Sequence, residues 1–225
     1  LKRYFGYDTF REGQEQVIDE LISGRDVLGV MPTGAGKSLC YQIPALIFPG
    51  ITLVISPLIS LMKDQVRALN EAGIHAAYLN SSLTQGQYYK ALSLAAEGRY
   101  PIIYVAPERL LTDSFLSFAV NADIAMVAVD EAHCVSQWGQ DFRPSYLKIT
   151  EFIQKLPKRP VVAAFTATAT KEVRDDIMDL LLLQDPYIVT TGFDRSNLFF
   201  QVESPKDKYA EVKNYIEQHP DESGI

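Results

Sequence analysis

A glycine-rich segment that ends in lysine and serine directly follows the apolar run 27–30. Residues 31–38 read Met-Pro-Thr-Gly-Ala-Gly-Lys-Ser. Glycines allow backbone N–H groups to converge on a polyphosphate, and a following helix directs its positive dipole end at the same anion. In such a loop Lys37 would reach the β and γ phosphates, and the Ser38 hydroxyl would bind Mg²⁺. The segment therefore predicts a nucleotide phosphate site formed by Thr33, Gly34, Ala35, Gly36, Lys37 and Ser38.

Two adjacent carboxylates end a second apolar run. Residues 124–129 lead into Asp130-Glu131-Ala132-His133. Hydrolysis of a Mg²⁺-nucleotide needs one carboxylate to hold the metal and another to orient or deprotonate the attacking water. We assign Asp130 to Mg²⁺, beside Ser38, and Glu131 to the water. Alone, the pair would read as a helix cap, but together with Lys37 it indicates a catalytic site of Lys37, Asp130 and Glu131.

One position departs from the strict phosphate-loop pattern, which has glycine where this chain has Met31. The inner glycines and the Lys37-Ser38 pair remain. An ordinary surface loop can also carry Gly-Lys-Ser, and the carboxylate pair at residues 130 and 131 argues against that alternative.

Apolar runs alternate with segments of helical period along the chain. The expected strands are 27–31, 51–56, 76–79, 102–106, 124–130, 161–165 and 187–191, and the expected helices include 58–72, 87–97, 146–156, 171–183 and 206–218. Uniformly apolar strands are buried on both faces of a parallel sheet, and ligands then sit at the carboxyl edge. The sequence thus predicts an α/β fold with a mainly parallel sheet and helices on both faces.

Composition sets the bounds for this reading. The chain has 225 residues, of which 47% are hydrophobic, so it can bury one substantial core. No apolar run reaches the ~18 to 20 residues of a membrane span, and no basic-then-apolar signal segment precedes the first strand. The chain begins at Leu1 without methionine, so we expect its natural start to lie upstream. Cys40 and Cys134 lack metal-ligand spacing, which favours a reduced, cytoplasmic protein.

The net charge of −7 argues against a general basic face for nucleic acid. Backbone N–H groups, helix N-termini and a few arginines can nevertheless hold phosphates without a global positive field. Any nucleic-acid site in this chain must therefore be local.

Several strings together carry a family resemblance that covers essentially the whole chain. They are residues 5–7 (Phe-Gly-Tyr), 10–14 (Phe-Arg-Glu-Gly-Gln), 31–38, 130–133 and 136–144 (Ser-Gln-Trp-Gly-Gln-Asp-Phe-Arg-Pro). The chain resembles the first motor lobe of RecQ-type DNA helicases. The resemblance implies a RecA-like P-loop NTPase fold that binds ATP and Mg²⁺ and takes part in 3′ to 5′ DNA unwinding, in repair and recombination. RNA helicases of the Asp-Glu-Ala-Asp class lack the last string and have Asp in place of His133.

An aromatic and a basic residue near the start can form a base site. Tyr7 and Arg11 lie four residues apart, so a ring and a guanidinium can sandwich a planar base. Gln14 can then pair its amide with the adenine edge. The resemblance implies this adenine role for all three, whereas from the residues alone packing of Tyr7 and Phe10 beneath the first helix would be favoured.

The string 136–144 places Trp138, Phe142 and Arg143 in an irregular segment unsuited to a helix face. Bases stack on such aromatic side chains for ~1 to 3 kcal/mol each with little sequence preference. In the resembled family this loop senses single-stranded DNA and couples it to ATP hydrolysis. The alternative is that Trp138 is a buried loop anchor.

Other turns at the expected sheet edge acquire roles through the same resemblance. The turns at Ser56 and Arg109, with Asp64 and Arg67 nearby, would grip DNA phosphates through free N–H groups. His133, with the hydroxyls of Thr166 and Thr168, would relay the state of the γ-phosphate. Alone, these segments read as ordinary capped turns. The segment 194–198 resembles an interlobe hinge.

The resemblance also implies what accompanies this chain. We expect residues 1–204 to form the first lobe and 205–225 to begin a second lobe, which would supply an arginine finger in cis. This chain alone would then bind Mg-ATP weakly and hydrolyse it poorly. We expect the protein to bind single-stranded and forked DNA and to be a monomer. If it is bacterial, we expect it to associate with the nucleoid. The resemblance also implies zinc-binding and winged-helix modules beyond residue 225. An RNA helicase, or a nucleotide-gated binding module that does not unwind, are the alternatives.

Overall fold

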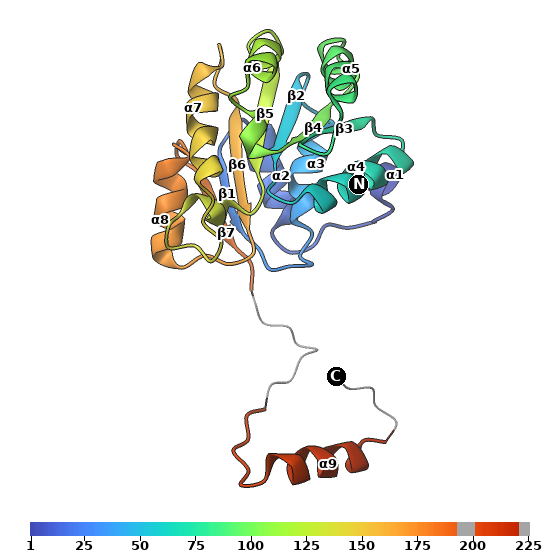
Figure 1. The fold of residues 1–225 in the computed structure, drawn as a ribbon, viewed down its shortest axis with the longest axis vertical. Helices are drawn as coiled ribbons and strands as arrows, with labels where there is room; N and C mark the ends of the chain where they lie inside the picture. Colours follow the sequence, from blue (N-terminus) through green and yellow to red (C-terminus); the bar gives the residue numbers. More distant parts are fainter. Residues whose placement is uncertain (193–200, 221–225) are drawn as a thin grey trace. The chain divides into compact units, whose positions relative to one another are not determined.

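A computed structural model describes residues 1–192 and 201–220 (Figure 1). The first of these ranges belongs to one compact unit, and the second belongs to another. The predicted hinge at 194–198 lies outside the described residues. The predicted lobe boundary at residue 204 stays a prediction.

The first unit is built on a parallel sheet of seven strands in the order β3-β4-β2-β5-β6-β1-β7. The strands are β1 Val27–Val30, β2 Ile51–Ile55, β3 Ala76–Leu79, β4 Ile102–Val105, β5 Ile124–Val129, β6 Val161–Thr166 and β7 Tyr187–Thr190. Each lies within one residue of its predicted range at either end. The prediction that the strands are buried on both faces was wrong for β7. Its residues alternate between half-buried and exposed, because β7 is an edge strand.

Helices cover both faces of this sheet, as predicted (Figure 1). The α-helices are α1 Lys2–Phe5, α2 Gln14–Ile22, α3 Lys37–Ala45, α4 Ile59–Glu71, α5 Gln85–Ala96, α6 Asp113–Ala119, α7 Lys148–Lys155, α8 Lys171–Leu180 and α9 Lys208–Gln218, and the 3-10 turns are η1 Pro107–Arg109, η2 Ala132–Val135 and η3 Pro144–Leu147. Helices α2, α3 and α4 bury Tyr41 and Met62 in one core, while α5 to α8 bury Phe115 and Phe152 in the other.

Four of the five predicted helices differ from their predicted ranges by two residues or more at one end. Helix α5 starts at Gln85 rather than at residue 87, and α9 starts at Lys208 rather than at residue 206. Residues 146 and 147 belong to the 3-10 turn η3 rather than to α7, because Pro144 starts a tighter turn there. Helix α8 ends at Leu180 instead of residue 183, since Leu182 takes a left-handed conformation with φ of 51°. Helix α6 was not predicted.

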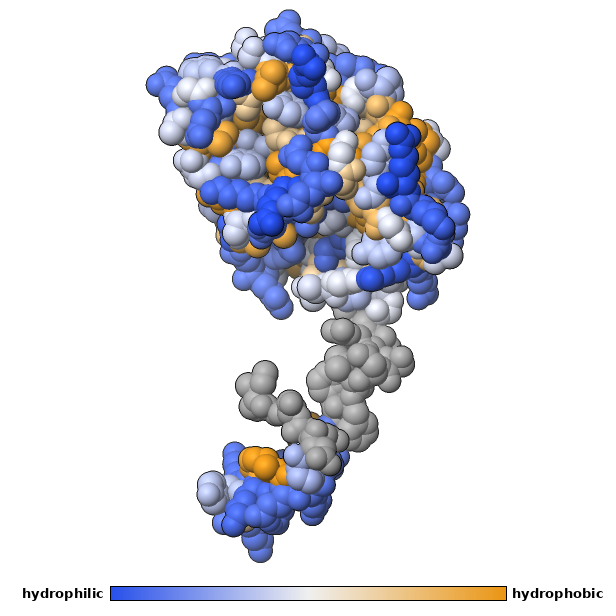
Figure 2. Space-filling model, turned by 90° about the vertical axis from the view of Figure 1, so that its right-hand side faces the viewer, coloured by the Kyte–Doolittle hydropathy of each residue, from blue (hydrophilic) through white to orange (hydrophobic). Residues whose placement is uncertain are grey.

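The strand order decides what meets at the carboxyl edge. Strand β6 lies between β1 and β5, so the loop after β1 and the acidic end of β5 flank Thr166. Within residues 1–192 and 201–220, no helix is long and apolar enough to cross a membrane. On the face shown in Figure 2, apolar side chains gather in patches among polar ones, including a patch on α9.

Candidate nucleotide and nucleic-acid site

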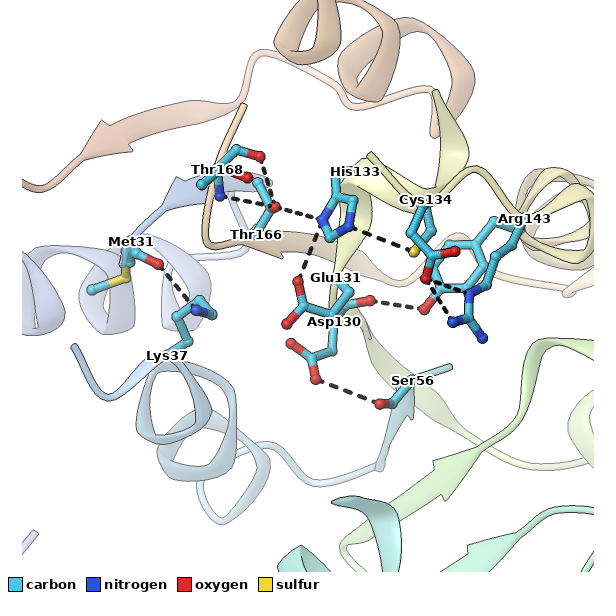
Figure 3. A network of polar contacts seen from close by, with 12 residues as sticks. Met31, Lys37, Ser56, Asp130, Glu131, His133, Cys134, Arg143, Thr166 and Thr168 are labelled. Carbon is cyan, nitrogen blue, oxygen red and sulfur yellow. Dashed lines mark hydrogen bonds and ion pairs between the residues drawn. The ribbon is translucent and has the colours of Figure 1, made fainter. Parts of the chain in front are cut away.

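The phosphate loop joins β1 to α3 and uses its glycines for conformations that other residues rarely adopt. Gly34 and Gly36 both have φ of 84°. A Cβ on Gly36 would also lie 2.4 Å from Gln14 Nε2, so glycine is needed there for space as well. Lys37, the first residue of α3, donates from Nζ to the Met31 carbonyl at 3.0 Å (Figure 3). The lysine is thus folded over its own loop.

Met31, the departure from the strict motif, has a structural reason. Its side chain is fully buried in the core beneath α2 and α3, and its N–H donates to the Thr166 carbonyl at 3.0 Å. The position therefore faces the core and does not face the cavity. An apolar side chain there stabilises the loop root while the inner glycines keep the phosphate-binding conformation.

The three residues predicted to hold adenine lie against the same loop. Tyr7 is 51% exposed, while Gln14 is buried. Gln14 Nε2 donates to the carbonyls of Ala35 and Gly36 at 3.2 and 3.1 Å, and its Oε1 accepts from the Arg11 N–H at 2.8 Å. The Arg11 guanidinium donates to the Gly34 carbonyl. In this structure the Gln14 amide therefore braces the phosphate loop, and its predicted pairing with adenine stays a prediction.

The two carboxylates after β5 have different environments. Asp130 is only 6% exposed, and its side chain accepts a hydrogen bond from Ser56 Oγ, just after β2, at 3.5 Å (Figure 3). Burial, with repulsion from Glu131 as the next cause, raises the pKa of Asp130 from its ordinary 3.8 to about 6. Glu131 is half-buried in a left-handed conformation with φ of 49°, which is costly for a residue with a side chain and is typical of functional sites.

A cavity of about 590 Å³ collects nearly all the predicted nucleotide residues. From the prediction it is lined by Tyr7, Arg11, Gln14, Thr33, Gly34, Gly36, Lys37, Ser38, Asp130 and Glu131. Ala35 does not line it and contributes its carbonyl to Gln14 instead. A larger hollow of about 760 Å³ lies at the opposite edge of the sheet, beside Tyr89, Phe118 and Asp123, and contains no predicted site residue.

The cavity also has walls that sequence reasoning missed. They include Thr9, Leu39, Gln42, Leu61 and Gln65 from the segments around α2, α3 and α4. Gln42 donates to Gln65 Oε1 at 2.8 Å and to the Tyr104 hydroxyl at 2.9 Å, which fixes this wall. Two glutamines on otherwise apolar helix faces are the only signal in the sequence that could have indicated them.

His133 connects the Glu131 carboxylate to β6. Its Nδ1 lies 2.9 Å from Thr166 Oγ1 and 3.3 Å from Glu131 Oε2 (Figure 3). The Thr166 hydroxyl donates to the Thr168 carbonyl at 3.0 Å, so His133 Nδ1 must carry the hydrogen that Thr166 Oγ1 accepts. The predicted group of His133, Thr166 and Thr168 is therefore contiguous, although Thr168 takes part through its backbone.

The loop after η2 presents its tryptophan to solvent. Trp138 is 79% exposed, so the alternative of a buried anchor is wrong. Phe142 is half-buried. Arg143 pairs with Asp141 at 2.6 Å and donates to the Pro57 carbonyl at 3.3 Å, which ties the loop to the turn after β2. An exposed indole on a tethered loop is suited to stacking on a partner.

In the turns predicted to grip DNA phosphates through N–H groups, the side chains of Ser56, Arg67 and Arg109 have partners within the protein. Ser56 is buried against Asp130. Arg109 lies over the Tyr88 ring, 5.0 Å from its centroid, and donates to the Asn80 carbonyl at 3.4 Å. Arg67 forms a surface ion pair with Glu71 on α4. In these turns, backbone N–H groups could therefore contact DNA phosphates directly, whereas the arginine side chains would first have to move.

Comparison with known proteins agrees with this geometry. Residues 11–176 match the model of the DEAD/DEAH box helicase family. The chain belongs to this family. It is 50% identical over its whole length to the ATP-dependent DNA helicase RecQ of Bacillus subtilis and 44% identical to that of Haemophilus influenzae. The RecQ-like DNA helicase BLM of Xenopus laevis is 40% identical over 98% of the chain. The predicted resemblance to RecQ-type helicases is thereby confirmed.

The chain matches only part of the length of each of these relatives. The chain spans 38% of the length of the B. subtilis relative, 36% of that from H. influenzae and 17% of that from X. laevis, and it covers their N-terminal part. Among solved structures, the Pyrococcus furiosus Hef helicase domain has a TM-score of 0.60 at 20% identity, over 80% of this chain and 37% of that one. A hypothetical ATP-dependent RNA helicase from Sulfolobus tokodaii has a TM-score of 0.62 at 23% identity, and the match covers 83% of this chain and 55% of that one. At these identities the likeness shows the fold alone, and the predicted RecA-like fold is confirmed.

Proposed function

We propose that this chain is the ATP-binding motor lobe of a RecQ-type DNA helicase, which unwinds DNA in the 3′ to 5′ direction at the expense of ATP. The observation that carries the proposal is that the single segment 130–143 reaches from the cavity to an exposed aromatic side chain. Its first residues, Asp130 and Glu131, line the same cavity as Lys37, and eight residues beyond Asp130 it exposes Trp138. A nucleotide site and a base-stacking loop thus share one short stretch of backbone.

In this proposal ATP lies with its phosphates on the loop 33–38 and its base between Tyr7 and Arg11. Mg²⁺ would be held by the Ser38 hydroxyl and Asp130, which are hard oxygen ligands of the kind this ion prefers. The described residues contain no group of three or more His, Cys, Asp or Glu side chains placed to hold a metal. A Mg²⁺ bound by Ser38 and Asp130 would complete its shell with nucleotide phosphates and water. When bound, the ion would neutralise charge on the phosphates.

The protein residues then divide the work. Lys37 would hold the β and γ phosphates, and Glu131 would orient the attacking water. His133 and Thr166 would pass the state of this site to the loop at Trp138, on which bases of single-stranded DNA stack. The pairing of a nucleotide site with an exposed aromatic loop favours DNA over RNA as the substrate, because the related RNA helicases lack this loop.

The second compact unit supports the expectation of a further lobe in cis. Helix α9 exposes four apolar side chains, Tyr209, Val212, Tyr215 and Ile216, each at 59% or more. A helix with such a stripe usually packs against other elements of a domain. We propose that residues from 205 on begin the second lobe, which would supply the arginine finger. The chain alone should therefore bind Mg-ATP weakly and hydrolyse it poorly, since an arginine finger contributes ~10³ to 10⁵ in rate.

The test is ATP turnover of the protein with both lobes, with and without single-stranded DNA or RNA. We compare the unsubstituted protein with Trp138→Ala, Lys37→Ala and the control Tyr89→Ala, which removes another exposed aromatic ring, on α5. Lys37→Ala should abolish turnover. Trp138→Ala should remove DNA stimulation while ATP binding and basal turnover persist, and Tyr89→Ala should behave like the unsubstituted protein.

Each alternative has its own outcome in this assay. Stimulation by RNA but not DNA would indicate an RNA helicase. Turnover that neither nucleic acid stimulates, with DNA binding that depends on ATP, would indicate a nucleotide-gated module. Full DNA-stimulated turnover by residues 1–225 alone would contradict the need for a second lobe.

A further inference from the structure

The root of the Trp138 loop is fixed by one buried hydroxyl. Ser136 is fully buried, and its Oγ donates to Asp176 Oδ2 on α8 at 2.6 Å. The same oxygen accepts the backbone N–H of Trp138 at 3.1 Å. A hydroxyl has one hydrogen and two lone pairs, so the Asp176 carboxylate sets the direction of the hydrogen and leaves a lone pair for Trp138.

The turn that carries the tryptophan is tight as well as tethered. The Gly139 N–H donates to the Ser136 carbonyl at 3.1 Å, which closes a turn over residues 136–139. A Cβ on Gly139 would lie 2.2 Å from the His133 carbonyl, so the turn packs against the segment that follows the carboxylates. Trp138 is therefore exposed in its side chain while its backbone is held from both sides.

Asp176 lies on α8, the helix that follows strand β6 and the turn that carry Thr166 and Thr168. Strand β6 ends at Thr166, and α8 starts five residues later with Thr170 as its cap. The segment 131–138 is thus tied to the β6–α8 unit at two points, through His133 to Thr166 at 2.9 Å and through Ser136 to Asp176 at 2.6 Å. The first tie lies near the catalytic carboxylates and the second lies at the root of the exposed indole.

We propose that Asp176 is a positioning residue for DNA sensing, which acts through Ser136 to hold Trp138 in the orientation that bases stack on. This inference rests on the proposed function, since it specifies how the loop in that proposal is held. Asp176 touches neither nucleotide nor DNA in this scheme. Its loss should loosen the loop, so that Trp138 must be ordered again on binding.

Trp138 is the only tryptophan of the chain, so its fluorescence reports the loop directly. The experiment measures time-resolved fluorescence anisotropy of residues 1–225 without DNA, for Asp176→Ala, Asp176→Asn and Asp175→Ala. Asp176→Ala should increase the fast, nanosecond depolarisation of the indole. Asp176→Asn keeps an acceptor for Ser136 and should restore the slow decay, and Asp175→Ala removes a neighbouring exposed carboxylate of α8 as the matched control.

The same samples are then titrated with oligothymidylate, and binding is followed by quenching of Trp138. Asp176→Ala should weaken binding by ~2- to 10-fold, the cost of ordering one large side chain. Ser136→Ala should give the same two effects, and the double variant should add nothing further, because both substitutions break one link. This second route decides the matter if Asp176→Ala proves unstable.

Anisotropy decays of Asp176→Ala and Ser136→Ala that match the Asp175→Ala control would overturn the inference. So would a double variant whose effects add. If oligothymidylate fails to quench Trp138 in the unsubstituted chain, the proposed DNA site fails, while the anisotropy measured without DNA still tests the link from Asp176 to the loop.

Discussion

Two buried aspartates stand at opposite edges of the sheet, and their surroundings differ in kind. Asp26, just before β1, is 2% exposed and accepts four hydrogen bonds. Both of its oxygens bind Arg159, at 3.1 and 2.5 Å, and the N–H groups of Val162 and Gln184 donate at 2.8 and 2.7 Å. Asp130, at the end of β5, is 6% exposed, and Ser56 Oγ is 3.5 Å away.

The difference separates a carboxylate that stabilises the fold from one that is kept for a ligand. A buried charge is costly unless cations and donors surround it. Asp26 has them and joins β1, β6 and the segment before β7. Around Asp130, burial and Glu131 raise the pKa of the carboxyl more than the Ser56 hydroxyl and the Lys37 charge lower it, and the raised pKa reflects that cost. We infer that the fold tolerates this cost at Asp130 because Mg²⁺ offsets it when ATP is bound.

The same substitution at the two sites should therefore act in opposite directions. Asp130→Asn removes the charge that we propose binds Mg²⁺, so ATP turnover of a protein with both proposed lobes should fall by ~10² to 10⁴-fold, the usual contribution of a positioned metal ion. Without nucleotide or metal, the same variant should be more stable at pH 8 by ~1 to 3 kcal/mol, because a poorly compensated buried charge is lost. Steady-state ATPase assays and urea unfolding measure the two effects. A variant of lower stability would contradict the comparison.

Asp26→Asn should show the reverse pattern. An amide leaves Arg159 without its charge partner and turns an NH₂ group toward backbone donors, so the free energy of unfolding should fall by ~2 to 4 kcal/mol. The ATP affinity of the folded protein should stay unchanged, because this edge of the sheet is remote from the cavity. Urea unfolding and nucleotide titration check both statements. Loss of ATP affinity at full folding would show that the two edges are not independent.

The sequence predicted much of the fold because the signals were local. Every strand lies within one residue of its predicted range, since apolar runs in a buried parallel sheet are nearly uninterrupted. The strand order is not a local property, and the placement of β6 between β1 and β5 needed the structure. The end of α8 was missed because Leu181–Leu183 continues the apolar pattern beyond the last helical turn.

At the site, motif residues could be predicted while their partners could not. Lys37, Asp130 and Glu131 are recognisable from adjacency in the chain, and the structure gathers them around one cavity. Gln14 shows the limit, because its two bonds to loop carbonyls depend on a contact across some twenty residues. The Asp26 and Asp176 bonds span even longer separations, and nothing in a run of acidic residues indicates which one is buried.

The last expected effect is the dependence of stability on pH that the Asp130 carboxyl should produce. Its pKa is about 6 in the folded chain and near 3.8 when unfolded, so between these values the folded state binds more proton. Protonation of Asp130 therefore raises the free energy of unfolding as pH falls through 6, and this contribution reaches its full value below about 4. The advantage of Asp130→Asn over the unsubstituted chain should accordingly be greatest above pH 6 and should vanish toward pH 4. Urea unfolding of both proteins across this range, with EDTA present, measures the difference. A constant difference would mean that Asp130 stays charged, which would require a cation near it even without metal.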